Sequence, residues 1–379
     1  MPISSLAERL RKARESAGLT IGEAASRLGF KNYQILSNIE KGEREVKVNE
    51  LAVFARTYFC NMSSFLINDD EPFTAINLLW RKAPTEERKK EVEAYIKNRF
   101  EQYHILEKLL EIDNKSNHSL ITIKQEDIRT NYQIDELCSK IGNMLNLGSK
   151  PALSLQKVME QDLQIKVLFI KLSDFGSAAS TVHQELGAAI VVNNEEAPWR
   201  INFTLAHELF HLITWNTFST AEIEADHNLF GEIEKKADRF ASTLLLPETA
   251  VRQELDKKII EKQLPFSDIV DIARDFGVST QALLYRMANL RLIPWDKANE
   301  LTKSEELAMI DRRIRNDSPC EAPVSERFIS LSAKCLRKGL ISRGKFAEII
   351  DIDRADIDEF LEYRGLTEME GESVEIMVA

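Results

Sequence analysis

Two of the six histidines in this 379-residue chain lie four residues apart, in the segment RINFTLAHELFHLITW at 200–215. On a helix this spacing puts His207 and His211 one turn apart, where both imidazoles can reach one metal ion. Glu208, next to the first histidine, can then act as a base toward a water molecule at that ion. The pattern predicts hydrolytic zinc chemistry. The alternative is an ordinary packing helix, and both can hold, because the aliphatic residues of the segment form a separate face.

A catalytic zinc site needs a third protein ligand. The segment GEIEKKADRFASTLLLP at 231–247 places Glu234 and Asp238 four residues apart on a second expected helix. Glu234 can bind the ion, and Asp238 can accept a hydrogen bond from the far nitrogen of a ligand histidine. Other acidic residues lie nearby and His227 is another candidate ligand, so the spacing alone leaves the third ligand open.

Two short apolar segments are expected to form strands beside the His-Glu helix. They are IKVLFIKL at 165–172 and LGAAIVVN at 186–193. Together they predict a small sheet next to the metal site. We expect that the strand ending at Asn193 can pair with an extended peptide substrate.

The stretches NFTLAHELFH, AAIVVN and EKKADRFASTLLLP resemble the ImmA/IrrE family of bacterial zinc metallopeptidases. The resemblance implies that His207, His211 and Glu234 bind Zn²⁺, that Glu208 is the general base and that the substrate is a peptide bond. It extends to DIARDFGVSTQALLYRMANLRLI at 271–293. Phe210 stands where glycine is commoner in the family, which predicts altered packing behind the metal.

The first 68 residues differ in charge from the rest of the chain. They contain ten Lys or Arg and seven Glu, a balance of +3, so the net charge of −11 leaves −14 for the remainder. Apolar residues recur at helical spacing, glycines stand where helices would end, and Thr20 and Asn32 are expected N-caps. This region is predicted to be an all-α bundle.

TIGEAASRLGF followed by NYQILSNIEKG resembles the helix-turn-helix of Xre-type phage repressors, over residues 5–66. The resemblance implies operator DNA as a partner, with an inverted repeat bound by a homodimer. The implied contacts to bases are Tyr33, Gln34, Ser37 and Asn38, and those to phosphates are Lys31, Lys41 and Arg44. Ile21 stands where a phosphate-binding glutamine is common, and the turn at GFKN is one residue longer than usual, so a fold kept for protein contact is the alternative.

The regions flanking the peptidase segment read as helical. The segment EERKKEVEAYIKNRFEQYHILEKLLEID predicts a long amphipathic connecting helix, which either packs between domains or dimerises. The pattern of apolar and turn residues in the C-terminal segment GLISRGKFAEIIDIDRADIDEFL is typical of a helix-turn-helix, with Ser342 as an N-cap. The segment also resembles the helical tail of peptidases that carry an Xre domain. Its acidic residues favour protein contact over DNA. The tail after Gly365 is expected to be disordered.

Composition favours a soluble, cytoplasmic, multidomain protein. The N-terminus lacks a signal peptide, and no apolar run could cross a bilayer, so no membrane contact is expected. Four widely spaced cysteines, without a CxxC pair, predict buried or incidental thiols and no disulfide framework.

The predicted fold class is multidomain and mainly α, with a small α+β zinc-peptidase domain and an N-terminal all-α helix-turn-helix bundle. The predicted domains are a DNA-binding domain at 1–68, a helical linker at 69–118, the metallopeptidase domain at 119–297 and a C-terminal helical domain with an acidic tail at 298–379. We predict a transcriptional regulator whose peptidase cleaves a repressor or toxin-linked partner in a stress, mobile-element or toxin-antitoxin operon. The alternative is a DNA-binding antitoxin or transcription factor whose peptidase-like domain senses a ligand or binds a partner with little proteolysis.

Overall fold

The structure is a computed structural model of the full chain. It describes residues 6–58, 65, 76, 78–80, 86–112, 123–172, 176–218, 227–259, 261, 263–316 and 323–368. The expected disordered tail lies outside these residues beyond Glu368, as do Cys60 and Cys320. Cys138 and Cys335 are buried free thiols, as predicted.

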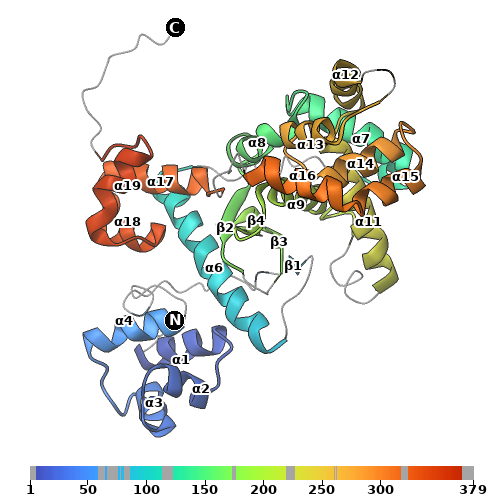
Figure 1. The fold of residues 1–379 in the computed structure, drawn as a ribbon. Helices are drawn as coiled ribbons and strands as arrows, with labels where there is room; N and C mark the ends of the chain where they lie inside the picture. The colour runs from blue at the N-terminus through green and yellow to red at the C-terminus, as the bar shows by residue number, and fades with distance from the viewer. Residues whose placement is uncertain are drawn as a thin grey trace.

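In the described residues from 6 to 58, the N-terminal bundle contains four helices, drawn in blue in Figure 1. These are α1 (Leu6–Ser16), α2 (Ile21–Arg27), α3 (Tyr33–Glu40) and α4 (Val48–Thr57). Their apolar faces enclose a separate core around Leu10, Leu36 and Phe54, each fully buried. The all-α prediction for this region is therefore confirmed.

Local sequence signals fix the ends of α2 and α3. Thr20 caps α2 in a capping box, in which its Oγ1 accepts from the amide of Glu23 and the Glu23 carboxylate accepts from the amide of Thr20. Asn32 caps α3 by accepting from the amide of Gln34 at 3.0 Å. Between the two helices Gly29 has a φ of 76°, a left-handed conformation that favours glycine. Both predicted caps are confirmed.

The rest of the chain builds a four-stranded sheet with helices around it. The strands are β1 (Leu79–Trp80), β2 (Lys166–Ile170), β3 (Ala178–His183) and β4 (Gly187–Asn193), in the order β1-β3-β4-β2. β3 is antiparallel to both β1 and β4, whereas β2 and β4 are parallel. The two predicted strands are confirmed as β2 and β4, while β1 and β3 were not predicted.

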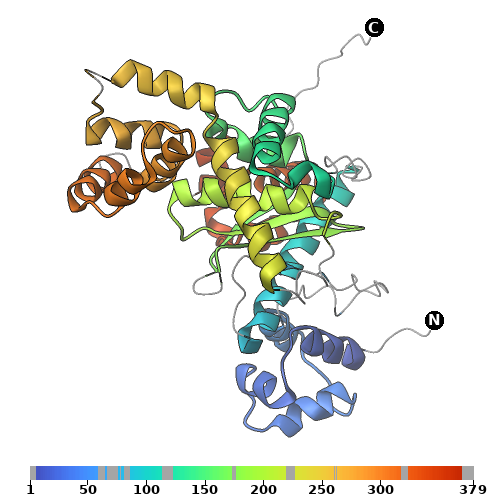
Figure 2. The ribbon, with the colours of Figure 1, turned by 90° about the vertical axis from the view of Figure 1, so that its right-hand side faces the viewer.

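Helices cover both faces of the sheet, because side chains alternate along each strand. Val167, Ile190 and Val192 point into a core with α7 (Asn131–Met144), α8 (Leu155–Gln161), α9 (Pro198–Ile213) and α11 (His227–Leu245). Leu168 and Val191 point the other way, toward α6 (Glu86–Leu109) and α17 (Glu326–Arg337). Figure 2 shows α11, in yellow, crossing the sheet on the side opposite α6. The sheet is thus the middle of three layers.

The position of β4 overturns one prediction. β4 pairs with β3 through residues 187–192 and with β2 through residues 189–193, so both of its sides are occupied. An extended substrate therefore cannot pair with the strand that ends at Asn193. Strand order depends on pairings between distant segments, which the apolar run at 186–193 does not encode.

Buried charges fasten α6 to the sheet and to α17. Glu107 of α6 accepts from the Lys166 ammonium of β2 at 2.7 Å and from the Arg327 guanidinium of α17 at 2.5 Å, and Lys166 and Glu107 are completely buried. Burial lowers the pKa of Lys166, and Glu107 opposes that effect. Removal of one partner would leave an unpaired charge in the interior. The predicted connecting helix is therefore packed firmly on the sheet.

Glu160 of α8 makes the stability of this layer depend on pH. The carboxyl group is 1% exposed and burial raises its pKa to about 8, while Oε2 accepts from the amide of Arg327 and Oε1 has no hydrogen-bond partner in the described residues. The folded state therefore favours the protonated form. The stability that this group provides is complete below its ordinary pKa of 4.5 and is lost as pH rises toward 8.

We expect Glu160→Gln to remove this pH dependence, because the amide is neutral at every pH and can still accept the bond from Arg327. Wild-type stability should fall relative to the variant by on the order of 3 kcal/mol between pH 5 and pH 8.5. Urea titrations of both proteins across this range measure the difference. A constant difference at all pH values would show that Glu160 is charged in the folded protein.

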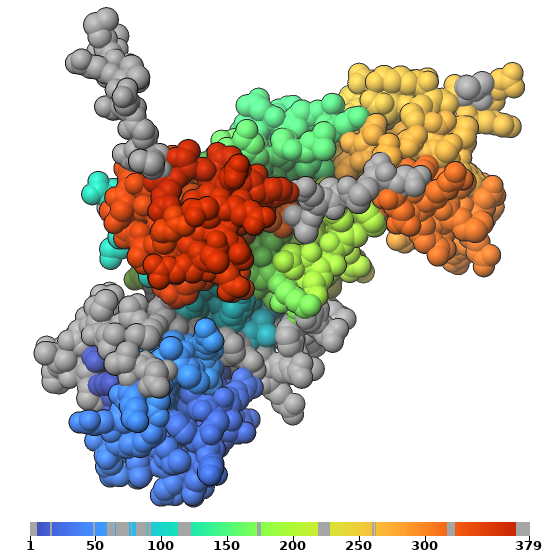
Figure 3. Space-filling model, turned by 60° about the vertical axis from the view of Figure 1, so that its left-hand side comes forward, coloured from blue at the N-terminus to red at the C-terminus, as the bar shows by residue number. Residues whose placement is uncertain are grey.

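The remaining helices form two groups. One follows α11 and comprises α12 (Glu248–Lys258), α13 (Phe266–Asp275), α14 (Thr280–Asn289), α15 (Trp295–Thr302) and α16 (Glu305–Asn316); the other is α17 with α18 (Arg343–Ile350) and α19 (Ile357–Tyr363). Ser342 caps α18, as predicted. Figure 3 shows the red C-terminal helices and the orange α15 and α16 at separate ends of this face. Within the described ranges, no helix has the length and apolar character needed to cross a membrane.

Candidate metal centre

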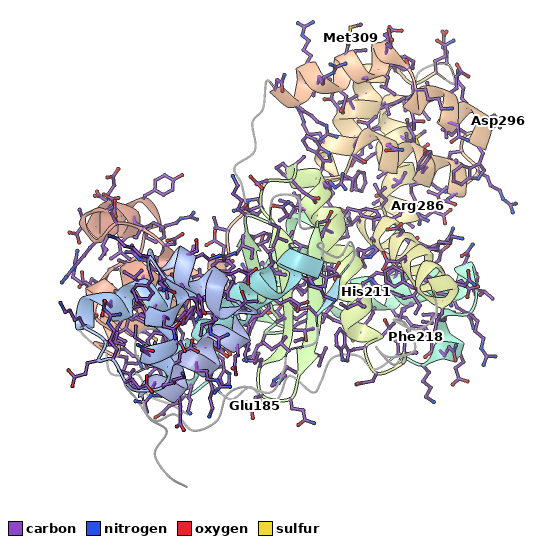
Figure 4. All side chains as sticks on the ribbon, turned by 90° about the horizontal axis from the view of Figure 1, so that it is seen from below. Glu185, His211, Phe218, Arg286, Asp296 and Met309 are labelled. Carbon is purple, nitrogen blue, oxygen red and sulfur yellow. The ribbon has the colours of Figure 1, made fainter. Side chains whose placement is uncertain are left out.

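Helix α9 carries the HELFH segment through the middle of the protein. Pro198 occupies its first turn, five residues after β4 ends at Asn193, so the sheet sets where the helix begins. Every residue from Thr204 to Ile213 is buried. The helix packs against β3 and β4 on one side and against α11 on the other. In Figure 4, His211 lies between the green strands and the yellow α11.

Three metal-binding side chains converge where α9 meets α11. The Nε2 atoms of His207 and His211 are 3.0 Å apart, and the carboxylate of Glu234 lies 3.4 Å from the first and 3.1 Å from the second. In the described part of the chain this is the one group of at least three potential ligands that could hold a metal ion. The structure therefore brings together the three ligands that the family resemblance implies.

These distances fit a zinc ion. Ligand atoms placed about 2.0 to 2.1 Å from a tetrahedral zinc stand about 3.3 Å from one another. Asp238 lies 2.9 Å from Nδ1 of His207, where it accepts a hydrogen bond from the Nδ1–H group. In this tautomer Nε2 carries no proton and keeps its lone pair. That lone pair faces the Glu234 carboxylate, so two acceptors point at each other. A cation between them satisfies both groups, and the donor set fits a metal.

The charge state of Glu234 agrees with a ligand role. Burial raises the pKa of Glu234, but hydrogen bonds from the His207 and His211 rings, which donate when no cation lies between the groups, outweigh this effect and lower the pKa to about 2. The group is therefore a carboxylate at neutral pH, as a zinc ligand must be. The side chain of His227, the other candidate ligand, lies outside the described side chains.

Glu208 is buried and, within the described ranges, its carboxylate has no hydrogen-bond partner. Its side chain is fully inaccessible, and neither carboxylate oxygen has a partner in the described residues. A buried charged group normally costs several kcal/mol unless it is paired or hydrogen-bonded. Glu208 directly follows His207, so this carboxylate belongs to the helix that carries two of the three converging side chains.

Phe210 explains how α9 and α11 stay in contact. It points away from the ligand side into the core, where its ring lies 5.5 Å from that of Phe240 on α11. A glycine at this position would leave this volume to other side chains. The ring therefore packs behind the metal ligands.

A polar network that the sequence did not predict anchors α11 from its other side. Asp135 of α7 accepts from both Arg239, at 2.6 Å, and Thr243 of α11, at 3.0 Å. Arg286 of α14, which is 3% exposed and labelled in Figure 4, donates to Thr243 and to the carbonyl of Leu246. Arg239 directly follows Asp238, so the network fixes the turn that carries both acidic residues. The only feature of the local sequence that points to this network is the i, i+4 spacing of Arg239 and Thr243.

The predicted DNA contacts gather around α3. Lys31, Tyr33, Gln34 and Lys41 are exposed, whereas Ser37, Asn38 and Arg44 are half-buried. The guanidinium of Arg44 donates to Glu50 at 2.7 Å and lies over the ring of Phe30, so this residue also holds the bundle together. Glu40, within the repressor-like ending of α3, pairs with Arg14 of α1 at 2.6 Å.

Comparison with known families assigns two regions of the chain. Residues 5–60 match the family model of a helix-turn-helix domain, and residues 160–288 match that of the IrrE N-terminal-like domain of peptidase family M78. The comparison with curated proteins found no match. The helix-turn-helix match therefore precedes the IrrE N-terminal-like match along the chain.

Proposed function

We propose that the protein is a transcriptional regulator with zinc-dependent endopeptidase activity. In this proposal residues 1–68 bind an operator, and the domain at 119–297, joined by the linker at 69–118 and followed by the helical domain at 298–379, cleaves a repressor or toxin-linked partner. The order of the two family matches supports a regulator that combines both activities. The controlled operon is proposed to serve stress response, a mobile element or a toxin-antitoxin pair.

Glu208 carries the peptidase part of the proposal. A pure binding module needs no carboxylate that is inaccessible and lacks a partner, next to three converging ligands. His207, His211 and Glu234 would hold the ion, which when bound polarises the scissile carbonyl and lowers the pKa of water. Glu208 takes a proton from the attacking water and passes it to the leaving amine. Asp238 orients the His207 ring throughout.

A cleavage assay with the products of the neighbouring genes tests this function. Zinc-loaded protein is incubated with each purified product, and fragments are identified by mass spectrometry. A single defined cut, removed by a chelator and restored by zinc, supports the peptidase. Binding of a product without any cut would favour the alternative of a ligand sensor or antitoxin with little proteolysis.

For the helix-turn-helix domain, we expect binding to a short inverted repeat near the protein's own promoter. Binding should require a dimer, because one domain of charge +3 makes few phosphate contacts. Gln34→Ala should cost about 1 to 3 kcal/mol at the contacted base pair and relax base preference there. Lys41→Ala should weaken all sequences alike and reduce the salt dependence of binding. Mobility-shift titrations across salt concentrations measure both effects.

Lys12→Ala is the matched control for the DNA experiment, because Lys12 is exposed on α1 and is not among the predicted DNA contacts. It removes the same charge and should leave base preference unchanged. If no fragment of the locus is bound even at low salt, the first 68 residues serve protein contact instead.

A further inference from the structure

The sheet has one edge that is occupied by a segment from outside the peptidase match. β1, at Leu79–Trp80, pairs antiparallel with β3, with Leu79 opposite Ser180 and Trp80 opposite Ala179. β3 itself lies within the segment matched to the peptidase family, which begins at residue 160. The short strand therefore comes from the stretch between the helix-turn-helix match and α6.

Side chains of this segment alternate between the two faces of the sheet, as in a bound strand. Ile76, Leu78 and Trp80 pack into the core formed with α6, and the indole Nε1 of Trp80 donates to Glu93 of α6 at 3.0 Å. Leu79 points to the opposite face and packs against the core that contains α9. Even-numbered residues thus anchor the segment on α6, while Leu79 reaches the face that carries the metal ligands.

The opposite edge of the sheet is closed. The amide of Phe169, in the edge strand β2, donates to Oγ of Ser325 at 3.0 Å, and Gln156 holds the neighbouring Val324 carbonyl at 2.8 Å. β4 is paired on both sides. Among the described strands, this leaves the edge of β3 as the place where an extended peptide can add to the sheet next to α9.

Ser180 of β3 lies at the same edge of the sheet. It lies opposite Leu79 on the α9 face, is completely buried, and its Oγ has no hydrogen-bond partner in the described residues. A buried hydroxyl without a partner is costly. Since residues directly opposite in a sheet project from the same face, the aliphatic side chain of Leu79 covers this hydroxyl and offers it no partner.

We propose that residues 78–80 act as an internal competitor of the substrate, holding the edge of β3 and keeping the peptidase in a low-activity state until the strand leaves. This inference rests on the proposed peptidase function. The ligand that replaces the strand is an extended peptide, bound through its backbone with one side chain directed to the α9 face. Because the strand lies between α4 and α6, a partner that pulls on the helix-turn-helix domain also pulls on the competitor.

Trp80→Ala tests the proposal in the full-length zinc-loaded protein. The change removes the buried indole and its bond to Glu93 while leaving α9 and α11 unchanged. If the edge is free in a tenth of wild-type molecules or fewer, cleavage of fluorescein-labelled β-casein should rise about tenfold or more. Leu331→Ala is the matched control, because it opens the same core from α17 and leaves every side chain of the strand in place. A rise in activity cannot come from misfolding.

A binding measurement tests the role of the strand independently of catalysis. In the Glu208→Gln background, a fluorescein-labelled peptide with the sequence of residues 76–82, INLLWRK, is followed by anisotropy. It should bind when Trp80→Ala is also present and fail to bind when the native strand is intact. The same peptide carrying Trp80→Ala is the control ligand and should bind at least about tenfold more weakly. Leu79→Asp offers a second release variant, since a carboxylate there faces an apolar core.

The outcomes of the two experiments are distinct. Unchanged casein cleavage in both release variants, with no peptide binding, overturns the competitor strand and leaves the peptidase proposal intact. Peptide binding confined to the release variants, with no cleavage of casein or of the neighbouring gene products by any variant, supports the strand at the β3 edge and overturns the peptidase. If the peptide binds none of the proteins, the inference fails whatever the cleavage result.

Discussion

Glu208→Gln is expected to lower peptide hydrolysis by about 10²- to 10⁴-fold while zinc content and fold remain unchanged. The amide has nearly the same size as the carboxylate but cannot take a proton from water. Its replacement breaks no hydrogen bond in the described residues, because neither oxygen has a partner. Thermal stability should stay the same or rise, since an unpartnered buried charge is removed.

Glu232→Gln is the matched control for this experiment. Glu232 lies on α11 two residues before Glu234 and is exposed, so the same chemical change there should leave the rate unaltered. Rates with the cleaved protein substrate and zinc content by atomic absorption are measured on both variants. Cleavage by Glu208→Gln at the wild-type rate would show that Glu208 is not the base.

His211→Ala should abolish zinc retention. The remaining His207 and Glu234 provide two ligands, which cannot keep the ion against a chelator. The wild-type protein is expected to hold about one zinc per chain, in keeping with the single ligand group in the described residues. Inductively coupled plasma mass spectrometry after dialysis against a chelator measures the difference.

Asp238→Asn should weaken zinc binding without abolishing it. This variant keeps all three ligands and loses only the carboxylate that accepts from His207, so zinc affinity should fall about 10- to 100-fold without complete loss. Equal retention by Asp238→Asn and wild type would remove Asp238 from the site. Full occupancy in a His207, His211 double variant would contradict the whole metal site.

Features set by neighbouring residues could be predicted from the sequence. Thr20, Asn32 and Ser342 cap helices through bonds to amides two or three residues away, so the signal and its effect lie together. The facing histidines of α9 follow from their spacing in the same way. The role of Glu234 could not be predicted from spacing alone, because its position beside the two histidines depends on how α9 packs against α11. The family resemblance identified it as the third ligand.

Features set by distant pairing could not be predicted. β3 contains Ala178, Ala179 and Ser180, small residues with little strand preference, and it is stabilised by β4 and by burial on both faces. β1 has only two residues, and its partner lies about 100 positions away in the chain. The same limitation led to the wrong expectation that β4 could pair with a substrate.

The layer formed by α6 and α17 restricts how this protein could exchange parts with others. A foreign DNA-binding module grafted upstream of residue 76 would leave the sheet covered on both sides. A graft at residue 119 would remove α6 from the face of the sheet that carries Leu168 and Val191, and it would leave the buried Lys166 without the carboxylate of Glu107. Exchange of the N-terminal domain between related genes can therefore yield a folded product only when the crossover point keeps α6, the helix that precedes the peptidase match.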